Sequence, residues 1–330
     1  ADAFASIGAA LVWFMVAAAL TMGTASAADT RVAFVPQIQG IPYYVAMEEG
    51  AGAAAKKFGV DYVQQGPTST NAADQLRIFD SFVNQGFNVV AVSPVDVETL
   101  KPAIARAKQQ GVHVITSDAD APGSARDFYV AQARDQDLGF TILDEMVKRV
   151  GEDGKIAVIS DAPTIQSLNN WIDAIKQRAA TKYPKLKIVS VDHTDGTAAR
   201  AFQFATDAMT RNPDLKGIIG IASTTCPGIA QAVEASGRSG EIVATGYCSP
   251  NTVRDYVKSG AMTYSVLWNP SDLGYLTVWA AKQLSEGKSF PDKVQVEGLE
   301  NEATWLPADK ILLLGPPMVF TAENIDQFKF

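Results

Sequence analysis

Short apolar runs alternate with amphipathic stretches along most of the chain. In the first half, the runs expected to form strands are Arg31–Val35, Val60–Gln64, Val89–Ser93 and Val112–Thr116. A helix is expected after the first run, because Tyr44, Met47 and Ala51 recur at three- and four-residue spacing and the series continues to Phe58. Further helices are expected over Ala72–Gln85 and Leu100–Gln110. Continuous apolar strands are typical of a parallel sheet covered by helices on both faces.

A second series of the same kind follows the polar turn Gly151-Glu152-Asp153-Gly154. Its expected strand and helix pairs are Lys155–Ser160 with Asn170–Tyr183, Leu186–Val191 with Ala198–Arg211, Gly217–Ile221 with Gly228–Ser236, and Glu241–Gly246 with Asn251–Ser259. From Tyr264 onward the pattern predicts a strand, a crossover, a helix over Asp272–Glu286 and a tail punctuated by Pro and Gly. Two such series predict an α/β protein with two similar doubly wound parallel-sheet lobes.

The N-terminus carries a different pattern. An apolar run from Ile7 to Leu20 is followed by the small residues Ala25-Ser26-Ala27. The run is shorter than the ~20 residues that span a bilayer, and a small-x-small tripeptide is what signal peptidase cleaves. We interpret residues 1–27 as a secretory signal peptide, with a membrane anchor as the alternative, and expect the mature chain to be free in a periplasm. No basic residue precedes the run and there is no initiator Met, so we expect the N-terminus to be truncated.

Composition narrows the function classes. The 330 residues are 47% hydrophobic, which is enough apolar mass for two cores. The net charge of −8 argues against nucleic acid or an anionic membrane surface as the main partner, since both need a positive footprint. Two His and two Cys leave little material for a metal site, and no cofactor is expected.

No enzyme motif is convincing. The segment from Gly50 to Ala55 formally fits a dinucleotide fingerprint, but it lies inside an expected helix rather than at a strand-to-helix turn. The chain has no G-x-S-x-G elbow, no P-loop and no H-E-x-x-H. We therefore expect a protein that is not an enzyme.

Polar and aromatic side chains gather where the expected strands end. Ligands of open parallel sheets bind beyond the carboxyl ends of the strands. The candidate ligand-binding residues there and at the lobe crossovers are Gln37, Tyr43, Tyr44, Asp118, Asp120, Gln132, Asn169, Ser223, Thr224, Trp268 and Asn269. Rings stack on C–H faces while carboxylates and amides bind hydroxyls, so this set suits a small polyhydroxylated molecule. It contains no Arg or Lys, which disfavours a phosphate or carboxylate ligand.

Several of these residues have structural alternatives. Asp118 and Asp120 are also frequent turn formers, and the second of them lies in a Gly- and Pro-rich loop. Tyr43 and Tyr44 are adjacent, so on a helix they diverge by about 100°, and we expect Tyr43 in the cleft and Tyr44 in the core. Trp171 fits the core as well as a ligand platform.

The two cysteines follow consecutive strands of the second lobe, which should be neighbours in the sheet. In an oxidising compartment a disulfide between Cys226 and Cys248 is possible, and it would contribute about 3 kcal/mol through loop closure. A pair of free thiols lining the pocket is the alternative.

Five segments together carry a family resemblance. They are Pro42-Tyr43-Tyr44, Phe82-Val83-Asn84-Gln85-Gly86, Val114-Ile115-Thr116-Ser117-Asp118, Leu267–Tyr275 and Asn324-Ile325-Asp326-Gln327-Phe328. In this order they resemble the type I periplasmic sugar-binding proteins of the ribose-binding superfamily, and most closely its rhamnose-binding and autoinducer-2-binding branch. The resemblance covers Arg31–Phe330. It implies a hinge between an N-terminal lobe of residues 29–133 plus 269–313 and a C-terminal lobe of residues 134–268 plus 314–330.

The resemblance also implies site roles. The two tyrosines would stack on the ligand, and Asp118 would accept hydrogen bonds from its hydroxyls, as residues at the position of Ser223 also commonly contact it. Many sugar binders carry an acidic residue where this chain has Cys248, so one expected contact is lost. Autoinducer-2 binders place Lys, Asp-Gln, Pro and Ala where this chain has Gln37, Ser167-Leu168, Ile221 and Ser223.

A neutral monosaccharide fits these departures better than autoinducer-2, and the segments Leu267–Tyr275 and Thr224-Thr225 are similar to the rhamnose-like branch. We expect a monomer that captures a deoxyhexose, pentose or related polyol by hinge closure and delivers it to the inner-membrane permease of an ABC importer. The alternatives are an autoinducer-2 receptor and a ligand-loaded partner of a chemoreceptor or sensor kinase. The sequence leaves the sugar, its anomer and the cysteine redox state open.

Overall fold

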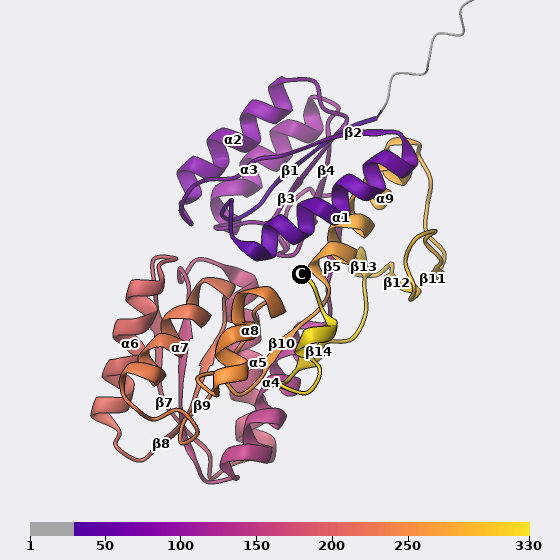
Figure 1. The fold of residues 1–330 in the computed structure, drawn as a ribbon. Coiled ribbons are helices and arrows are strands. Elements are labelled where there is room, and N and C mark those ends of the chain that lie inside the picture. Colours follow the sequence, from indigo (N-terminus) through magenta and orange to yellow (C-terminus); the bar gives the residue numbers. More distant parts are fainter. Residues whose placement is uncertain (1–29) are drawn as a thin grey trace, which may run out of the picture.

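The computed structural model describes residues 30–330, so the predicted signal peptide lies outside the described residues. These residues form two α/β lobes (Figure 1). The chain passes between the lobes after β5 (Phe128–Ala131), after β10 (Ser265–Leu267) and after β13 (Ile311–Leu313). The fold class predicted from the sequence is confirmed.

The first lobe is built on a sheet of eight strands in the order β11-β12-β13-β5-β4-β3-β1-β2. Its other strands are β1 (Thr30–Val35), β2 (Val60–Gln64), β3 (Val89–Val92), β4 (His113–Ser117), β11 (Lys293–Val294) and β12 (Ala303–Leu306). The strands from β2 to β13 pair in parallel, and β12 and β11 extend the sheet antiparallel.

Helices cover both faces of this sheet. They are α1 (Pro42–Phe58), α2 (Ala72–Asn84), α3 (Val97–Gln109) and α9 (Pro270–Ser285). In β1, Val32 and Phe34 pack with residues of α1 and α9, whereas Ala33 and Val35 pack with residues of α2 and α3. Burial on both faces is the reason that the strands read as unbroken apolar runs.

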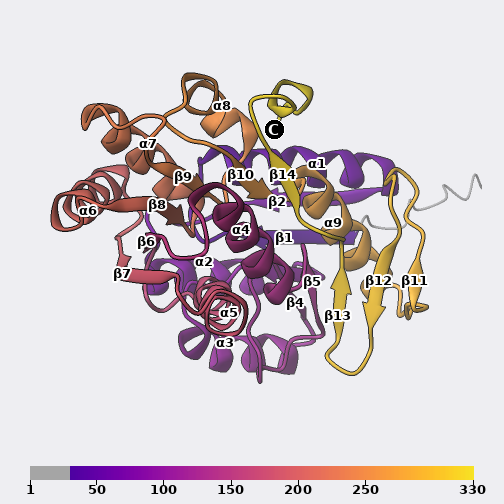
Figure 2. The same ribbon diagram turned by 90° about the horizontal axis from the view of Figure 1, so that it is seen from below.

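The second lobe has a four-stranded parallel sheet in the order β7-β6-β8-β9. Its strands are β6 (Lys155–Ser160), β7 (Lys187–His193), β8 (Leu215–Gly220) and β9 (Val243–Gly246). Its helices are α4 (Asp135–Val150), α5 (Gln166–Lys182), α6 (Ala198–Arg211), α7 (Cys226–Ala235) and α8 (Pro250–Ser259), with a short 3₁₀ turn η1 (Ser223–Thr225) before α7. Figure 2 shows α4 and α5 on the opposite side of this sheet from α6 and α7.

Helices α1 and α9 come from distant parts of the sequence and pack side by side (Figure 1). At Gly50 of α1 a Cβ would overlap the backbone carbonyl of Ser271, and at Gly274 of α9 it would overlap that of Met47. These glycines let the two backbones approach, which accounts for Gly50 in the segment that formally fits a dinucleotide motif.

The chain end returns to the second lobe. Strand β14 (Met318–Phe320) pairs antiparallel with β10, and the 3₁₀ turn η2 (Ile325–Gln327) follows. The sequence pattern had not assigned β5 or α4, and α5 begins at Gln166 rather than Asn170. The proposed lobe boundaries, residues 29–133 plus 269–313 and 134–268 plus 314–330, stay a prediction. Between residues 30 and 330 no helix combines the length and the apolar character needed to cross a membrane.

A candidate ligand-binding site between the lobes

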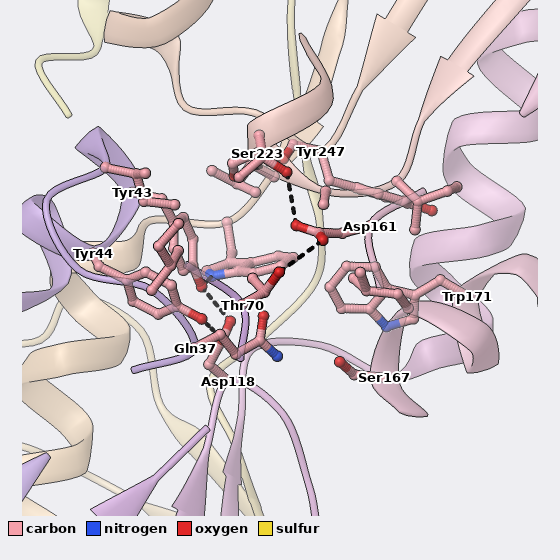
Figure 3. A pocket seen from close by; sticks show the side chains of 18 residues that line it. Gln37, Tyr43, Tyr44, Thr70, Asp118, Asp161, Ser167, Trp171, Ser223 and Tyr247 are labelled. Atoms are coloured by element: carbon pink, nitrogen blue, oxygen red, sulfur yellow. Dashed lines mark hydrogen bonds between the residues drawn. The ribbon is translucent and has the colours of Figure 1, made fainter. Parts of the chain in front are cut away.

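A cavity that is partly open to solvent lies between the lobes (Figure 3). Its lining residues are Gln37, Ile38, Ile41, Tyr43, Tyr44, Thr70, Asp118, Asp161, Ser167, Leu168, Trp171, Ile221, Ala222, Ser223, Thr224, Tyr247, Leu267 and Trp268. No Lys or Arg is among them.

Asp118 organises the wall that the first lobe contributes. It follows β4 directly, with a left-handed backbone (φ 70°) and a side chain that is almost fully buried. Oδ1 accepts from the Tyr43 hydroxyl at 2.6 Å, and Oδ2 accepts from the hydroxyls of Tyr44 at 2.7 Å and Ser93 at 2.6 Å. The carboxylate is thus held by three side chains, two from α1 and one that follows β3, and it does not cap a turn.

Tyr43 and Tyr44 do not diverge as the helical spacing predicted. Both belong to the first turn of α1, their rings meet edge to face with centroids 4.9 Å apart, and both hydroxyls reach Asp118 (Figure 3). The expectation that Tyr44 faces away from the cleft is wrong, because a tyrosine is long enough to return to the same carboxylate. The indole N–H of Trp268 donates to the Tyr43 hydroxyl at 2.9 Å and closes the wall from the lobe crossover.

Burial sets the electrostatics of this wall. It raises the pKa of Asp118, and the hydrogen bonds from Ser93, Tyr43 and Tyr44 oppose that rise. It also raises the pKa of both tyrosines well above the usual value, with the Asp118 charge acting in the same direction. The tyrosines therefore stay protonated donors at neutral pH.

Asp161 organises the wall of the second lobe. It follows β6 directly and is 2% exposed. Oδ1 accepts from the backbone N–H of Ala162 at 2.6 Å and from the Thr70 hydroxyl at 3.2 Å, while Oδ2 accepts from the Thr224 hydroxyl at 2.9 Å. Burial raises its pKa, and these three donors oppose the rise.

The Thr70–Asp161 hydrogen bond joins the two lobes. Thr70 lies just ahead of α2 in the first lobe, and Asp161 ends β6 in the second. Sequence reasoning missed both residues. For Asp161 the signal was present, because it immediately follows the expected strand Lys155–Ser160, the position at which ligand-binding residues were sought. Thr70 sits in a loop without periodicity and carried no such signal.

Aromatic rings fill one side of the cavity. The Trp171 ring lies edge to face with Tyr247 at 4.9 Å and with Trp268 at 5.8 Å between centroids. Trp171 lines the cavity, while its indole N–H donates to Asp135 at 2.8 Å. The residue is at once part of the core and part of the cavity wall.

Seven of the predicted site residues meet in this cavity. They are Gln37, Tyr43, Tyr44, Asp118, Ser223, Thr224 and Trp268.

Two predicted residues, Asp120 and Asn169, are not among the side chains that line it. The carboxylate of Asp120 pairs with the Arg126 guanidinium, with Nη2 at 2.8 Å from Oδ2, and accepts from Thr116. The Asn169 amide donates to the backbone carbonyl of Pro163 at 2.9 Å. Each side chain is used locally, so neither reaches the cavity.

Gln132 and Asn269 line a separate hollow beside the lobe crossovers. The Gln132 side-chain oxygen accepts from the Tyr129 hydroxyl at 3.3 Å. The Asn269 side-chain oxygen caps α9, accepting from the backbone N–H of Ser271 at 2.9 Å. These two side chains therefore do not line the main cavity, and their role as ligand contacts stays a prediction.

Cys226 and Cys248 form a disulfide with Cα atoms 6.5 Å apart. It joins the start of α7 to the loop after β9, and β8 and β9 are neighbouring strands. Cys226 follows Ser223 and Thr224 closely, and Cys248 follows Tyr247. The bond therefore ties together two loops that line the cavity.

Residues 32–289 match the protein family described as periplasmic binding protein domain. The D-allose-binding periplasmic protein of Escherichia coli (strain K12) is 26% identical over 269 residues, which cover 77% of this chain and 84% of that protein. The ribose import binding protein of the same organism is 22% identical over 290 residues, covering 88% and 96%.

Two solved structures have the same fold. An ABC transporter solute binding protein from Clostridium phytofermentas with bound L-rhamnose has a TM-score of 0.84 and 27% identity, covering 91% of this chain and 98% of that one. LsrB from Clostridium saccharobutylicum in complex with AI-2 has a TM-score of 0.84 and 25% identity, covering 91% and 100%.

Proposed function

Because the chain belongs to the periplasmic binding protein domain family, we propose that it is the sugar-binding component of an ABC importer. It captures a small neutral monosaccharide, namely a deoxyhexose, a pentose or a related polyol, by closure of the two lobes. The observation that carries this proposal is the cavity between the lobes, in which two buried carboxylates and a set of aromatic rings meet without a Lys or Arg. The protein performs capture and no chemistry.

The chemistry of the lining supports a neutral ligand. Aromatic rings such as Trp268 and Tyr43 stack on C–H faces, and carboxylates accept hydrogen bonds from hydroxyls. An anionic ligand would lie beside Asp118 and Asp161 with no cation in the lining to balance it.

Autoinducer-2 is the alternative ligand, and the lining of the cavity disfavours it. The departures from the pattern of autoinducer-2 binders fall at Gln37, Ser167, Leu168, Ile221 and Ser223. All five of these residues line the cavity. The relatives that bind allose, ribose or rhamnose, by contrast, take neutral sugars. The fold is shared with these relatives, and the cavity lining departs from that of autoinducer-2 binders, so we favour a neutral sugar as the ligand.

We place the mature protein in the periplasm, exported by the segment at residues 1–27, as a monomer. Its partner is an inner-membrane permease, which would recognise the closed, loaded form. A chemoreceptor or sensor kinase is the alternative partner. Stimulation of the ATPase of a reconstituted importer by loaded protein separates the two, because a sensory protein closes normally and leaves that ATPase unchanged.

A thermal-shift panel tests the ligand class. Residues 28–330 are heated with pentoses, hexoses, 6-deoxyhexoses, polyols and autoinducer-2, each in large excess. A ligand at 100 times its Kd adds about 2.7 kcal/mol to the free energy of unfolding, so a true ligand raises the Tm by several degrees. A shift with one neutral sugar supports the proposal, and a shift with autoinducer-2 alone would overturn it.

A further inference from the structure

The side-chain donors of the first wall are already engaged inside the protein. The hydroxyls of Tyr43 and Tyr44 both donate to Asp118, at 2.6 and 2.7 Å. The indole N–H of Trp268 donates to the Tyr43 oxygen at 2.9 Å. None of these three groups has a second hydrogen to offer.

The side-chain donors around Asp161 are also engaged inside the protein. The hydroxyls of Thr70 and Thr224 donate to Asp161, at 3.2 and 2.9 Å. The Ser223 hydroxyl donates to the backbone carbonyl of Tyr247 at 3.1 Å. A hydroxyl has a single hydrogen, so these groups face the cavity as acceptors.

The remaining aromatic donors point out of the cavity. The Trp171 indole donates to Asp135 at 2.8 Å, and the Tyr247 hydroxyl donates to the backbone carbonyl of Leu138 at 2.9 Å. Among the lining side chains this leaves the Ser167 hydroxyl and one N–H of the Gln37 amide, whose other N–H reaches the Pro94 carbonyl at 3.2 Å.

Acceptors, in contrast, remain on both walls. A carboxylate has about four acceptor positions. Asp118 uses three for Tyr43, Tyr44 and Ser93, and Asp161 uses three for Thr70, Thr224 and the Ala162 N–H. Each carboxylate thus has one position left, on opposite sides of the same cavity (Figure 3).

We infer that the site recognises a ligand that donates hydrogen bonds to both walls, to Asp118 on one wall and to Asp161 on the other. This inference rests on the proposed function and narrows it. It assigns Asp161 as the specificity-determining residue of the second lobe. The site selects polyhydroxylated compounds and protonated amino compounds, and it rejects a carbonyl or carboxylate at the contacted positions, because acceptor would then face acceptor without a hydrogen between them.

Titration calorimetry on matched ligands tests the selection. The probes are D-glucose, D-galactose and D-mannose, each beside its 2-amino-2-deoxy derivative and its uronic acid, which keep the ring and change one substituent. For any hexose that binds, we expect the amino sugar to bind at least as tightly and the uronate to bind at least tenfold more weakly. A uronate that binds as tightly as its hexose would overturn the inference.

Two variants test the role of Asp161 with L-rhamnose, or with whichever neutral sugar gives the largest thermal shift. In Asp161→Asn one carboxylate oxygen becomes an NH2 donor and the negative charge is lost, and we expect the Kd to rise at least tenfold, as for loss of a hydrogen bond to a charged group. Asp120→Asn is the matched control, because that carboxylate is also partly buried but pairs with Arg126 outside the cavity, and its Kd should stay unchanged. Equal affinity of Asp161→Asn and the unaltered protein contradicts the assignment.

The failure of this inference differs from the failure of the proposed function. If no neutral sugar or polyol binds, the proposed function fails. If a sugar binds but Asp161→Asn is without effect, only the inference fails. Should Asp161→Asn unfold, the comparison of hexoses, amino sugars and uronates on the unaltered protein decides.

Discussion

Asp118 is held by its backbone as well as by its side chain. Its φ of 70° lies in the left-handed region, which few residues other than Gly adopt and which Asp tolerates better than most. Non-glycine residues in this region are enriched at functional sites, where the surrounding structure enforces them. Here the hydroxyls of Tyr43, Tyr44 and Ser93 fix the carboxylate, so it is in place before a ligand arrives.

The raised pKa of Asp118 predicts a pH dependence of stability. The pKa of Asp118 is higher in the folded protein than in the unfolded chain. At a pH between these two pKa values the folded protein binds more protons than the unfolded chain. The contribution of Asp118 to the free energy of unfolding therefore falls as pH rises through this interval. Asp118→Asn removes the term. We expect the variant to become more stable relative to the unaltered protein, with a larger free energy of unfolding, as pH rises above the usual carboxyl range. Urea unfolding between pH 3.5 and 7 measures it, and a difference that stays constant with pH would contradict it.

At the residue scale the sequence predicted the first wall better than the second. Residues that directly follow a recognisable strand or begin the next helix, such as Asp118 and Tyr43, could be found by position. Asp120 and Asn269 stood in equally suitable places, but one pairs with Arg126 and the other caps α9. Such local partners depend on three-dimensional contacts that spacing along the chain does not reveal.

Strands could be predicted from the sequence where helices bury both faces of the sheet. Eight strands of the two sheets, β1 to β4 and β6 to β9, appear as apolar runs in the sequence, and the structure has them within a residue or two, whereas β5 and β13 were not predicted. The packing of α1 on α9 could not be foreseen, because it joins residues more than 200 positions apart through glycines that have no side chain to form a pattern.

Close packing of α1 on α9 predicts opposite effects for two glycines of one helix. A Cβ at Gly50 overlaps the Ser271 carbonyl, whereas a Cβ at Gly52 meets no atom within 4 Å. We expect Gly50→Ala to lower the free energy of unfolding by more than about 2 kcal/mol and Gly52→Ala to raise it by about 0.5–1 kcal/mol through helix propensity. Chemical unfolding of the two variants measures this, and equal effects would mean that α1 and α9 pack less closely than described.

The disulfide predicts a stability difference centred on the second lobe. Cys226 and Cys248 are 22 positions apart, so loop closure contributes about 3 kcal/mol in the chain-entropy model. We expect the Cys226→Ala, Cys248→Ala double variant to unfold at lower denaturant concentration and to bind sugar more weakly, because Ser223, Thr224 and Tyr247 lose their fixed loops. A double variant with the stability of the reduced protein supports this account, and one as stable as the oxidised protein would contradict it.

At the scale of the whole molecule, ligand capture is an equilibrium between arrangements of two lobes. A ligand that contacts both walls favours the closed arrangement by its differential affinity. The Thr70–Asp161 hydrogen bond acts in the same direction, since it spans the lobes beside the cavity. Which residues end up opposite one another across the cavity depends on this arrangement, and no local sequence pattern specifies it.

Removing that contact should weaken capture without unfolding the protein. We expect Thr70→Val to raise the Kd of the bound sugar about three- to tenfold, as the loss of about one hydrogen bond implies. Thr181→Val is the control, because that exposed hydroxyl bonds to the Gln177 and Arg178 carbonyls of its own helix and not across the lobes. Calorimetry on both variants decides, and an unchanged Kd in Thr70→Val would show that the closed, loaded state does not use this hydrogen bond.

Capture of a neutral sugar between the lobes, at the wall that Asp118 organises, is the property from which the other proposals follow. The most direct measurement is titration calorimetry of the neutral sugar with the largest thermal shift into residues 28–330 and into the Asp118→Asn variant. We expect one sugar to bind per chain and the Kd to rise about 10- to 100-fold in the variant, because a hydrogen bond to a buried charge is lost. Binding of that sugar with the same Kd in both proteins would contradict it.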